Sequence, residues 1–149
     1  MKLIRQMENI YKQIYSKIMN DIKIFNNPQF GNIRVVGDSD YPMFCLADIC
    51  RILNLRTDGV LPRLKKDGYN LIGVTDSMGR GQEMYFIDEQ NLYRVIMRSD
   101  KKEAENFQDW VCREVLPSIR KHGAYLTSET IEKALTSPDF LIQIATELK

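Results

Sequence analysis

The residues of this chain of 149 amino acids that could do chemistry are mostly cations rather than catalytic groups. His122 is the only histidine, so any Ser-His-Asp or Cys-His arrangement would have to use it. It follows Arg120 and Lys121 and precedes Gly123, a setting in which a cation at the end of a helix explains it better. The sequence also contains no Walker A loop, no HExxH motif and no other metal-ligand cluster. We therefore expect no catalytic residues, no cofactor and no metal ion.

The cations gather in two places along the chain. Between Arg51 and Lys66 five cations accompany a single acid, Asp58. Lys101 and Lys102 lie in the first turn of a predicted helix, where the helix dipole disfavours cations, so an external anion would explain them. Arg94 and Arg98 precede them. Our candidate phosphate contacts are Arg56, Arg63, Lys65, Lys66, Lys101 and Lys102.

A third candidate is a loop that we expect to join two strands, at residues 71–76 and 83–87. Arg80 lies there between two glycines, at what would be the tip of a hairpin. Arg80 and Gln82 could reach base edges or phosphates, and we predict that they act as wing-like groove contacts. Charge runs are also typical of a solvated surface, so the residues alone leave nucleic-acid binding and protein binding equally open.

The totals restrict the class of protein only loosely. A net charge of +1 neither indicates nor excludes a nucleic-acid partner. The three cysteines form no CxxC pair and are odd in number, which favours a reducing compartment inside the cell. No signal peptide is visible, and no apolar run approaches the about 20 residues that a membrane helix needs.

Residues 1–20 read as a helix with an apolar seam at alternating spacings of three and four. The seam consists of Ile4, Met7, Tyr11, Ile14 and Ile18. Two interpretations stay open. The seam either packs on its own domain or serves oligomerisation, and its length of about two and a half heptads does not decide between them.

The middle of the chain predicts hairpins and short helices. Residues 22–25 and 33–36 read as the two strands of a hairpin, followed by a strand at 43–45 and a helix over 46–53. Thr57 or Asp58 is expected to cap a second short helix, which together with the first has the outline of a helix-turn-helix. Pro62 weakens that outline unless the second helix starts only at Leu61.

Residues 89–125 read as two helices around which the rest of the chain is expected to fold. Asp88 is the expected N-cap of the first, and Asp100 with Glu103 resembles a capping box for the second. In the second helix an apolar stripe predicts the core: Phe107, Val111, Val115 and Ile119, with the single Trp110 beside it.

The C-terminal part of the chain contains four further signals. Pro117 is expected to kink the second helix or restart it, and Gly123 to end it. A short helix is expected at 128–135, and Ser137 with Pro138 should open another.

Three blocks in this order resemble the Bro-N domain of phage and prophage antirepressors and baculovirus Bro proteins: DIKIFNNPQFGNIRVV, MFCLADICRILNL, and the run from GRGQ to HGAY. The strongest block is 107–123, with W-V-x-x-E-V-L-P-S-I-R-K-x-G. The resemblance implies an α+β domain associated with DNA binding. With the strands and helices predicted above, we expect an α+β fold of small antiparallel sheets or hairpins packed with short helices, plus helical N- and C-terminal extensions. It implies no catalytic activity. It also implies a bacterial host cytoplasm.

We expect three parts: an N-terminal helix at 1–20, a Bro-N-like domain at 21–125, and a helical extension at 126–149 toward a missing C-terminal region. The function that the resemblance implies is a DNA-binding regulatory domain of an antirepressor-like protein, which regulates transcription for a bacteriophage or prophage. The alternative is a protein-binding module that sequesters a phage repressor without touching DNA. Two departures from the family pattern are Pro62 and the extra residues 1–20.

Overall fold

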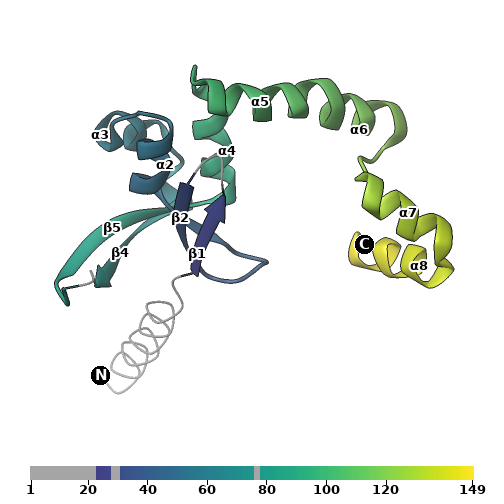
Figure 1. Ribbon diagram of the computed structural model, residues 1–149, viewed down its shortest axis with the longest axis horizontal. Coiled ribbons are helices and arrows are strands. Elements are labelled where there is room, and N and C mark those ends of the chain that lie inside the picture. The colour runs from purple at the N-terminus through teal and green to yellow at the C-terminus, as the bar shows by residue number, and fades with distance from the viewer. Residues whose placement is uncertain (1–22, 28–30, 76–77) are drawn as a thin grey trace. The chain divides into compact units, whose positions relative to one another are not determined.

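A computed structural model describes residues 23–27, 31–75 and 78–149, with the backbone alone for 23–27 (Figure 1). The chain divides into two compact units, Met1–Phe107 and Gln108–Lys149, which are described here one at a time. The predicted helix at 1–20, with its five candidate oligomerisation residues, lies outside the described residues.

The first unit contains a five-stranded antiparallel sheet with the strand order β1-β2-β3-β5-β4. Its strands are β1 (Lys23–Asn27), β2 (Gly31–Val36), β3 (Met43–Cys45), β4 (Tyr69–Thr75) and β5 (Gly81–Asp88). The two predicted hairpins are β1–β2 and β4–β5, and both are confirmed. The short strand β3 pairs with β2 on one side and β5 on the other, and so joins the hairpins into one sheet.

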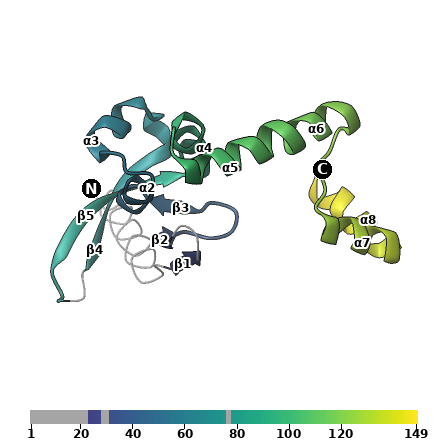
Figure 2. The same cartoon turned by 45° about the horizontal axis from the view of Figure 1, so that its top comes forward.

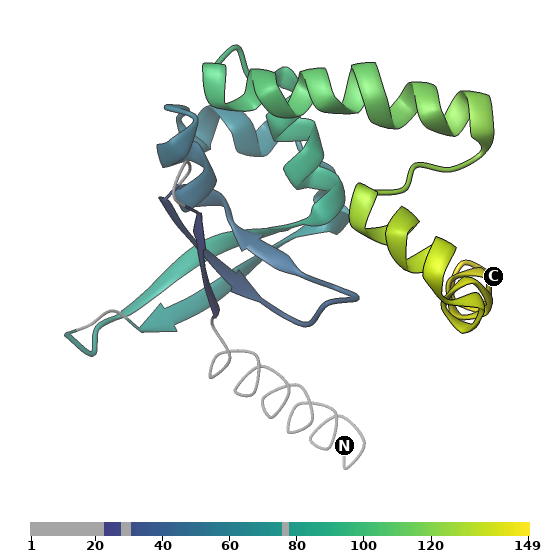
Figure 3. The same ribbon diagram turned by 45° about the vertical axis from the view of Figure 1, so that its right-hand side comes forward.

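Short helices complete the first unit, which confirms the α+β fold. They are α2 (Leu46–Ile52), α3 (Thr57–Val60), the 3-10 turns η1 (Leu61–Arg63) and η2 (Lys66–Gly68), α4 (Glu89–Arg98) and α5 (Lys102–Trp110), whose last three residues belong to the second unit. Figures 1 and 3 show α2, α3 and α4 gathered on one side of the sheet, while the β4–β5 hairpin extends away from them.

The core of this unit lies on both faces of the sheet. Phe86 and Ile87 are each 0% exposed, and because neighbouring strand residues point to opposite faces they belong to different clusters. The helix-side cluster consists of Leu46, Ile49, Cys50, Leu53, Leu64, Ile87, Val95 and Ala104. The other cluster consists of Val36, Cys45, Ile72, Val74 and Phe86.

Local signals define where α2 ends and α3 begins. Asn54 adopts a left-handed conformation (φ 50°), and the Leu55 N–H donates to the Cys50 carbonyl at 2.8 Å, the pattern of a Schellman C-cap. The predicted cap of α3 is wrong. Arg56 is the N-cap residue and its side chain makes no capping bond, while Thr57 and Asp58 are already helical.

Pro62 occupies the second position of the 3-10 turn η1, which starts at Leu61. A proline is tolerated there because the first N–H groups of a helical segment have no partner within it. The second element of the helix-turn-helix outline is therefore one α-helical turn of four residues followed by a 3-10 turn.

Of the predicted caps of the next two helices, one is confirmed and one is corrected. Asp88 caps α4 as predicted, since its carboxylate accepts from the Asn91 N–H at 2.8 Å. The cap position of α5 is Lys101 rather than Asp100, because the Lys101 carbonyl accepts the first helical bonds, from Ala104 and Glu105, each at 3.0 Å. The predicted capping box thus begins one residue too early.

The second unit is helical. After the end of α5 come the π-helix η3 (Val111–Val115), α6 (Leu116–His122), α7 (Ser128–Thr136) and α8 (Pro138–Glu147). The prediction for Pro117 is confirmed: the α-helix is interrupted by a π segment and restarts with Pro117 at its second position. A proline cannot donate to the carbonyl of residue 113, and a widened turn just before it accommodates that loss.

Both predicted boundaries that follow are also confirmed. Gly123 ends α6 in a left-handed conformation (φ 79°). Ser137 caps α8, accepting from the Phe140 N–H at 3.4 Å, and Pro138 is the first helical residue.

The expectation that the Trp110 stripe forms the core is wrong. Trp110 is 41% exposed and Ile119 46% exposed. Trp110 instead packs edge-on against Tyr125, with ring centroids 5.8 Å apart and the indole N–H donating to the Tyr125 hydroxyl at 3.2 Å. Helical spacing shows that a face is apolar but not that another element covers it.

Candidate nucleic-acid interface

Three arginines of the first unit line one small cleft. Arg63 comes from η1, and Arg94 and Arg98 come from α4. The cleft has a volume of about 60 Å³, and its remaining lining is apolar: Leu55, Val60, Leu64 and Val95. We call it the arginine cleft.

The helical repeat and the core place these arginines. Arg94 and Arg98 stand one turn apart, and residues four apart share a face of a helix. Val95 between them is 4% exposed and anchors the opposite side of α4 in the core. Leu64 is 8% exposed and anchors the end of η1 in the same cluster, which brings Arg63 to α4.

Asn91 fixes the turn that follows η1. Its side chain is 0% exposed and binds the main chain of Lys65 twice, accepting from the Lys65 N–H at 3.0 Å and donating to the Lys65 carbonyl at 3.0 Å. Gly68 packs so closely behind this contact that a Cβ atom would lie 2.5 Å from Asn91 Nδ2. Lys65 and Lys66 are therefore held beside the beginning of α4.

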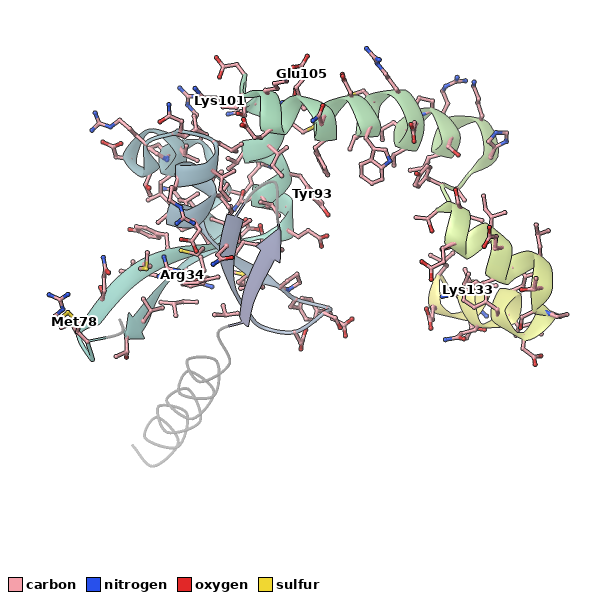
Figure 4. All side chains as sticks on the ribbon, in the orientation of Figure 1. Arg34, Met78, Tyr93, Lys101, Glu105 and Lys133 are labelled. Atoms are coloured by element: carbon pink, nitrogen blue, oxygen red, sulfur yellow. The ribbon has the colours of Figure 1, made fainter. Side chains whose placement is uncertain are left out.

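Lys101 and Lys102 stand at the start of α5, directly after the end of α4. Figure 4 shows Lys101 near the helices of the first unit and far from the tip of the β4–β5 hairpin. We call the seven cations of η1, the turn after it, α4 and the start of α5 the basic surface: Arg63, Lys65, Lys66, Arg94, Arg98, Lys101 and Lys102. Within the described part of the chain none of these side chains forms an ion pair.

Arg56, also a predicted phosphate contact, is already paired. Its guanidinium group binds the Asp58 carboxylate at 3.1 Å and 2.8 Å. A nucleic acid would therefore have to compete with Asp58 for this cation.

The predicted wing residues lie elsewhere. Gln82 pairs with Val74 in the β4–β5 hairpin, and Arg80 donates to the Met78 sulfur at 3.5 Å. Figure 4 shows Met78 at the outer end of this hairpin. Of the eight predicted DNA contacts, Arg80 and Gln82 thus lie in the β4–β5 hairpin and Arg56 lies at the start of α3. The other five belong to the basic surface.

A partly buried ion pair joins the sheet to α2. Asp48 of α2 is 6% exposed and accepts from the Arg34 backbone N–H, Nε and Nη2, each at 2.9 Å. Burial alone would raise the pKa of Asp48, but the hydrogen bonds and charge of Arg34 and the charge of Arg51 together hold this pKa below its usual value. Arg34 therefore serves the fold and is not available to a ligand in the way the basic surface is.

Two further cavities differ in character from the arginine cleft. One of about 220 Å³ is apolar except for Glu103, with Ile33, Phe44, Leu92 and Phe107 among its lining residues. The other, of about 300 Å³, has an acidic lining that includes Asp40, Asp67, Asp88 and Glu89. The arginine cleft is thus the one of these three cavities that is lined by cations and no acid.

The residues that the structure describes contain no cluster of three or more His, Cys, Asp or Glu side chains able to hold a metal ion. Every helix among them is too short or too polar to cross a membrane.

Arg94 and Arg98 belong to the cleft although they are not among the contacts predicted from the sequence. Their spacing of four residues is a usable signal, since it places two cations on one helix face. Local patterns do not predict that Arg63 lines the same cleft, because this depends on how η1 packs against α4.

Comparison with known proteins identifies the family. The profile of the BRO family, N-terminal domain (Bro-N), matches residues 32–117. Bro-N is a regulatory type of domain known from phage and viral antirepressor-like proteins, and it is not an enzyme family.

Individual relatives agree with the family match. An uncharacterized protein of Haemophilus influenzae is 46% identical over 83 residues, which are 55% of this chain and 41% of that protein. A protein of Invertebrate iridescent virus 3, named for its Bro-N domain, is 33% identical over 128 residues, covering 70% of this chain and 31% of that protein. A similarly named protein of Invertebrate iridescent virus 6 is 30% identical over 125 residues, covering 69% of this chain and 30% of that protein.

The chain therefore spans only 30% to 41% of the length of these relatives. No solved structure matches it. Because the family profile covers more than half of the chain and includes every residue of the basic surface, we conclude that this chain belongs to the Bro-N family.

Proposed function

We propose that this chain is a DNA-binding regulatory domain of a phage or prophage antirepressor-like protein that acts in the cytoplasm of a bacterial host. The observation that carries the proposal is the basic surface, whose cations come from neighbouring elements and have no acidic partners among the described residues.

Unpaired cations on one surface suit a polyanion better than a neutral ligand. Phosphate contacts supply most of the sequence-independent affinity of DNA-binding proteins. The helix α4 that connects both ends of the basic surface has ten residues and is about 15 Å long, which is enough to span several backbone phosphates. Family membership supports a regulatory role without a catalytic step.

Fluorescence anisotropy with a random DNA duplex tests this proposal. We expect affinity to fall steeply between about 50 and 200 mM salt, with a log–log slope of about −0.9 for each phosphate contact. Absence of binding even at the lowest salt concentration would refute DNA binding by this chain. The hairpin residues are tested in the same assay by Arg80→Ala, and unchanged affinity for every duplex would remove the wing from the proposal.

A second candidate function is a protein-binding module that sequesters a repressor. It is favoured by large apolar side chains on or directly after α7 and α8 that no described residue covers: Leu135 is 81% exposed, Ile142 66% and Leu148 79%. Surfaces of this kind commonly mark protein–protein contacts.

Self-association belongs to this second candidate. The apolar seam at residues 1–20 motivates the proposal that the chain is a homo-oligomer, which light scattering before and after removal of these residues would test. A monomer at high protein concentration in both cases would contradict it.

A further inference from the structure

We propose that the arginine cleft binds a single phosphate group of the DNA backbone, shared by the guanidinium groups of Arg63, Arg94 and Arg98. This inference rests on the proposed DNA-binding function and specifies one subsite within it. In this subsite three cations of the basic surface bind the same phosphate, instead of each binding a phosphate of its own.

The size of the cleft suits an oxyanion. A volume of about 60 Å³ has room for roughly four water-sized groups, at the 10–15 Å³ that each requires. That is the room needed by the oxygens of one tetrahedral phosphate group. A planar nucleobase is larger than this volume and would not fit. The cleft is therefore suited to the DNA backbone and not to base readout.

The electrostatics of the cleft also call for an anion. The cleft is lined by three cations and no acid. Arg94 and Arg98 stand one turn apart on α4, whose Val95 is buried, so both are held on the same side of this helix. An anion bound in the cleft would therefore meet positive side chains and no negative one.

The choice of arginine and the apolar floor strengthen binding to phosphate. A guanidinium group presents a planar fork of N–H donors that matches two phosphate oxygens at once. The floor of Leu55, Val60, Leu64 and Val95 excludes water from one side of the cleft. Charge-assisted hydrogen bonds are stronger in such a setting than in open solvent.

Neighbouring cations favour DNA over an acidic peptide as the source of the anion. Lys65 and Lys66 lie on the segment that follows Arg63, and Lys101 and Lys102 follow Arg98. A regular row of phosphates would satisfy cations on both sides of the cleft, whereas an acidic peptide would need carboxylates at matching intervals.

The test compares the salt dependence of DNA binding by the complete chain and five variants. These are Arg63→Gln, Arg94→Gln, Arg98→Gln, the triple variant, and Arg113→Gln as a control for the loss of an exposed cation from the other unit. Glutamine keeps much of the side-chain length while removing the charge. Thermal unfolding of each variant establishes whether it is folded.

The log–log slope is proportional to the number of phosphates that the protein neutralises. One phosphate shared by three arginines therefore predicts a smaller change in slope than three phosphates bound separately. The triple variant should bind DNA about tenfold more weakly at low salt. Its log–log slope should become shallower by about 0.9, no more than for loss of one phosphate contact. Three separate contacts would instead change the slope by about 2.7 and would overturn the shared site. The Arg113→Gln control should keep the wild-type slope.

The remaining outcomes separate this inference from the proposed function. If the wild-type chain binds DNA with a steep salt dependence and the triple variant does the same, the cleft is not a phosphate site but the proposed function stands. If the wild-type chain binds no duplex, the proposed function is refuted, and the proposal that the cleft binds a DNA phosphate is refuted with it.

A companion measurement tests the cleft itself without DNA. Inorganic phosphate, compared with chloride at equal ionic strength, should raise the unfolding temperature of the wild-type chain more than that of the triple variant. An equal shift in both would show that phosphate has no site in the cleft. A glutamate-rich peptide that displaces DNA from the wild-type chain as effectively as an oligonucleotide of equal charge would overturn the choice of DNA.

Discussion

At the scale of single residues, this chain uses different arginines for folding and for its charged surface. Arg34 is committed to the buried Asp48, whereas Arg63, Arg94 and Arg98 are exposed and have no carboxylate partner in the described part of the chain. The distinction depends on burial and partners, since nothing in the residue type separates these arginines.

The Arg34–Asp48 contact should contribute substantially to stability. We expect Asp48→Asn to lower the free energy of unfolding by about 1–3 kcal/mol, because it weakens a partly buried, multiply bonded pair. Asp58→Asn, which breaks the exposed pair with Arg56, should cost less than about 1 kcal/mol. Urea unfolding of both variants measures the difference, and equal losses would show that the burial of Asp48 is unimportant.

The same contact should make stability depend on pH. The pKa of Asp48 is lower in the folded chain than in the unfolded chain, so folding favours the ionised form. Its contribution is fully present above the unfolded pKa of about 4 and is lost as the pH falls through the lower folded value. The stability difference between wild type and Asp48→Asn should therefore be constant from about pH 5 to 7 and shrink below about pH 4. A difference that shrank only above neutral pH would point to another group.

At the scale of elements, the turn at η2 depends on the absence of a side chain at Gly68. A Cβ atom there would lie 2.5–2.7 Å from atoms of Asn91 and Asp88, so Gly68→Ala must displace either the turn or the start of α4. We expect it to cost about 1–3 kcal/mol and to weaken DNA binding by moving Lys65 and Lys66.

Gly59 provides the matched control. It lies in α3, and no heavy atom outside its own helix comes within 4 Å of the place that a Cβ atom would occupy. Gly59→Ala should therefore be neutral or stabilise the chain by up to about 1 kcal/mol. Denaturant unfolding and anisotropy of both variants test the pair. Similar behaviour of the two alanine variants would contradict the role of close packing at Gly68.

The elements that can be predicted from the sequence are those with local causes. Alternating and β-branched residues predict the hairpins, Asp88 and Ser137 predict helix starts, and Pro117 with Gly123 predicts an interruption and an end. These signals operate within a few residues of the chain and need no knowledge of its partners.

The features that cannot be predicted depend on distant neighbours. Trp110 lies on an apolar stripe but is 41% exposed, because the spacing of the stripe does not determine how far other residues bury it. Arg63 meets Arg94 and Arg98, which are far from it in the sequence, only because η1 packs beside α4. The lysines of the candidate site can therefore be predicted from the local excess of cations in the sequence. The arginine cleft cannot, because it depends on packing between distant segments.

At the scale of the whole molecule, the basic surface and the exposed apolar side chains on or directly after α7 and α8 belong to different units. The basic surface lies entirely within Met1–Phe107, and the exposed side chains Leu135, Ile142 and Leu148 lie within Gln108–Lys149. Figure 2 shows α7 and α8, which carry or adjoin these apolar residues, as a pair of helices joined by a short connection.

This division predicts that the two binding activities can be separated. Changing Leu135 and Ile142 to serine should reduce association with protein partners or with other copies of the chain, because it removes exposed apolar area. Affinity for DNA should remain within about twofold of the wild type, since no charge changes. Light scattering and anisotropy on the same preparations provide the measurements. Parallel loss of both activities would show that the units act together.

The contact between Asn91 and Lys65 has an evolutionary consequence. Asn91 holds the main chain of Lys65 through its N–H and its carbonyl, and neither bond involves the lysine side chain. Any residue with a backbone N–H can therefore occupy position 65 without disturbing the turn, and proline alone is barred. Descendants of this chain are free to exchange the side chain at that position for another charge or shape. The buried amide preserves the scaffold while the ligand preference at position 65 diverges.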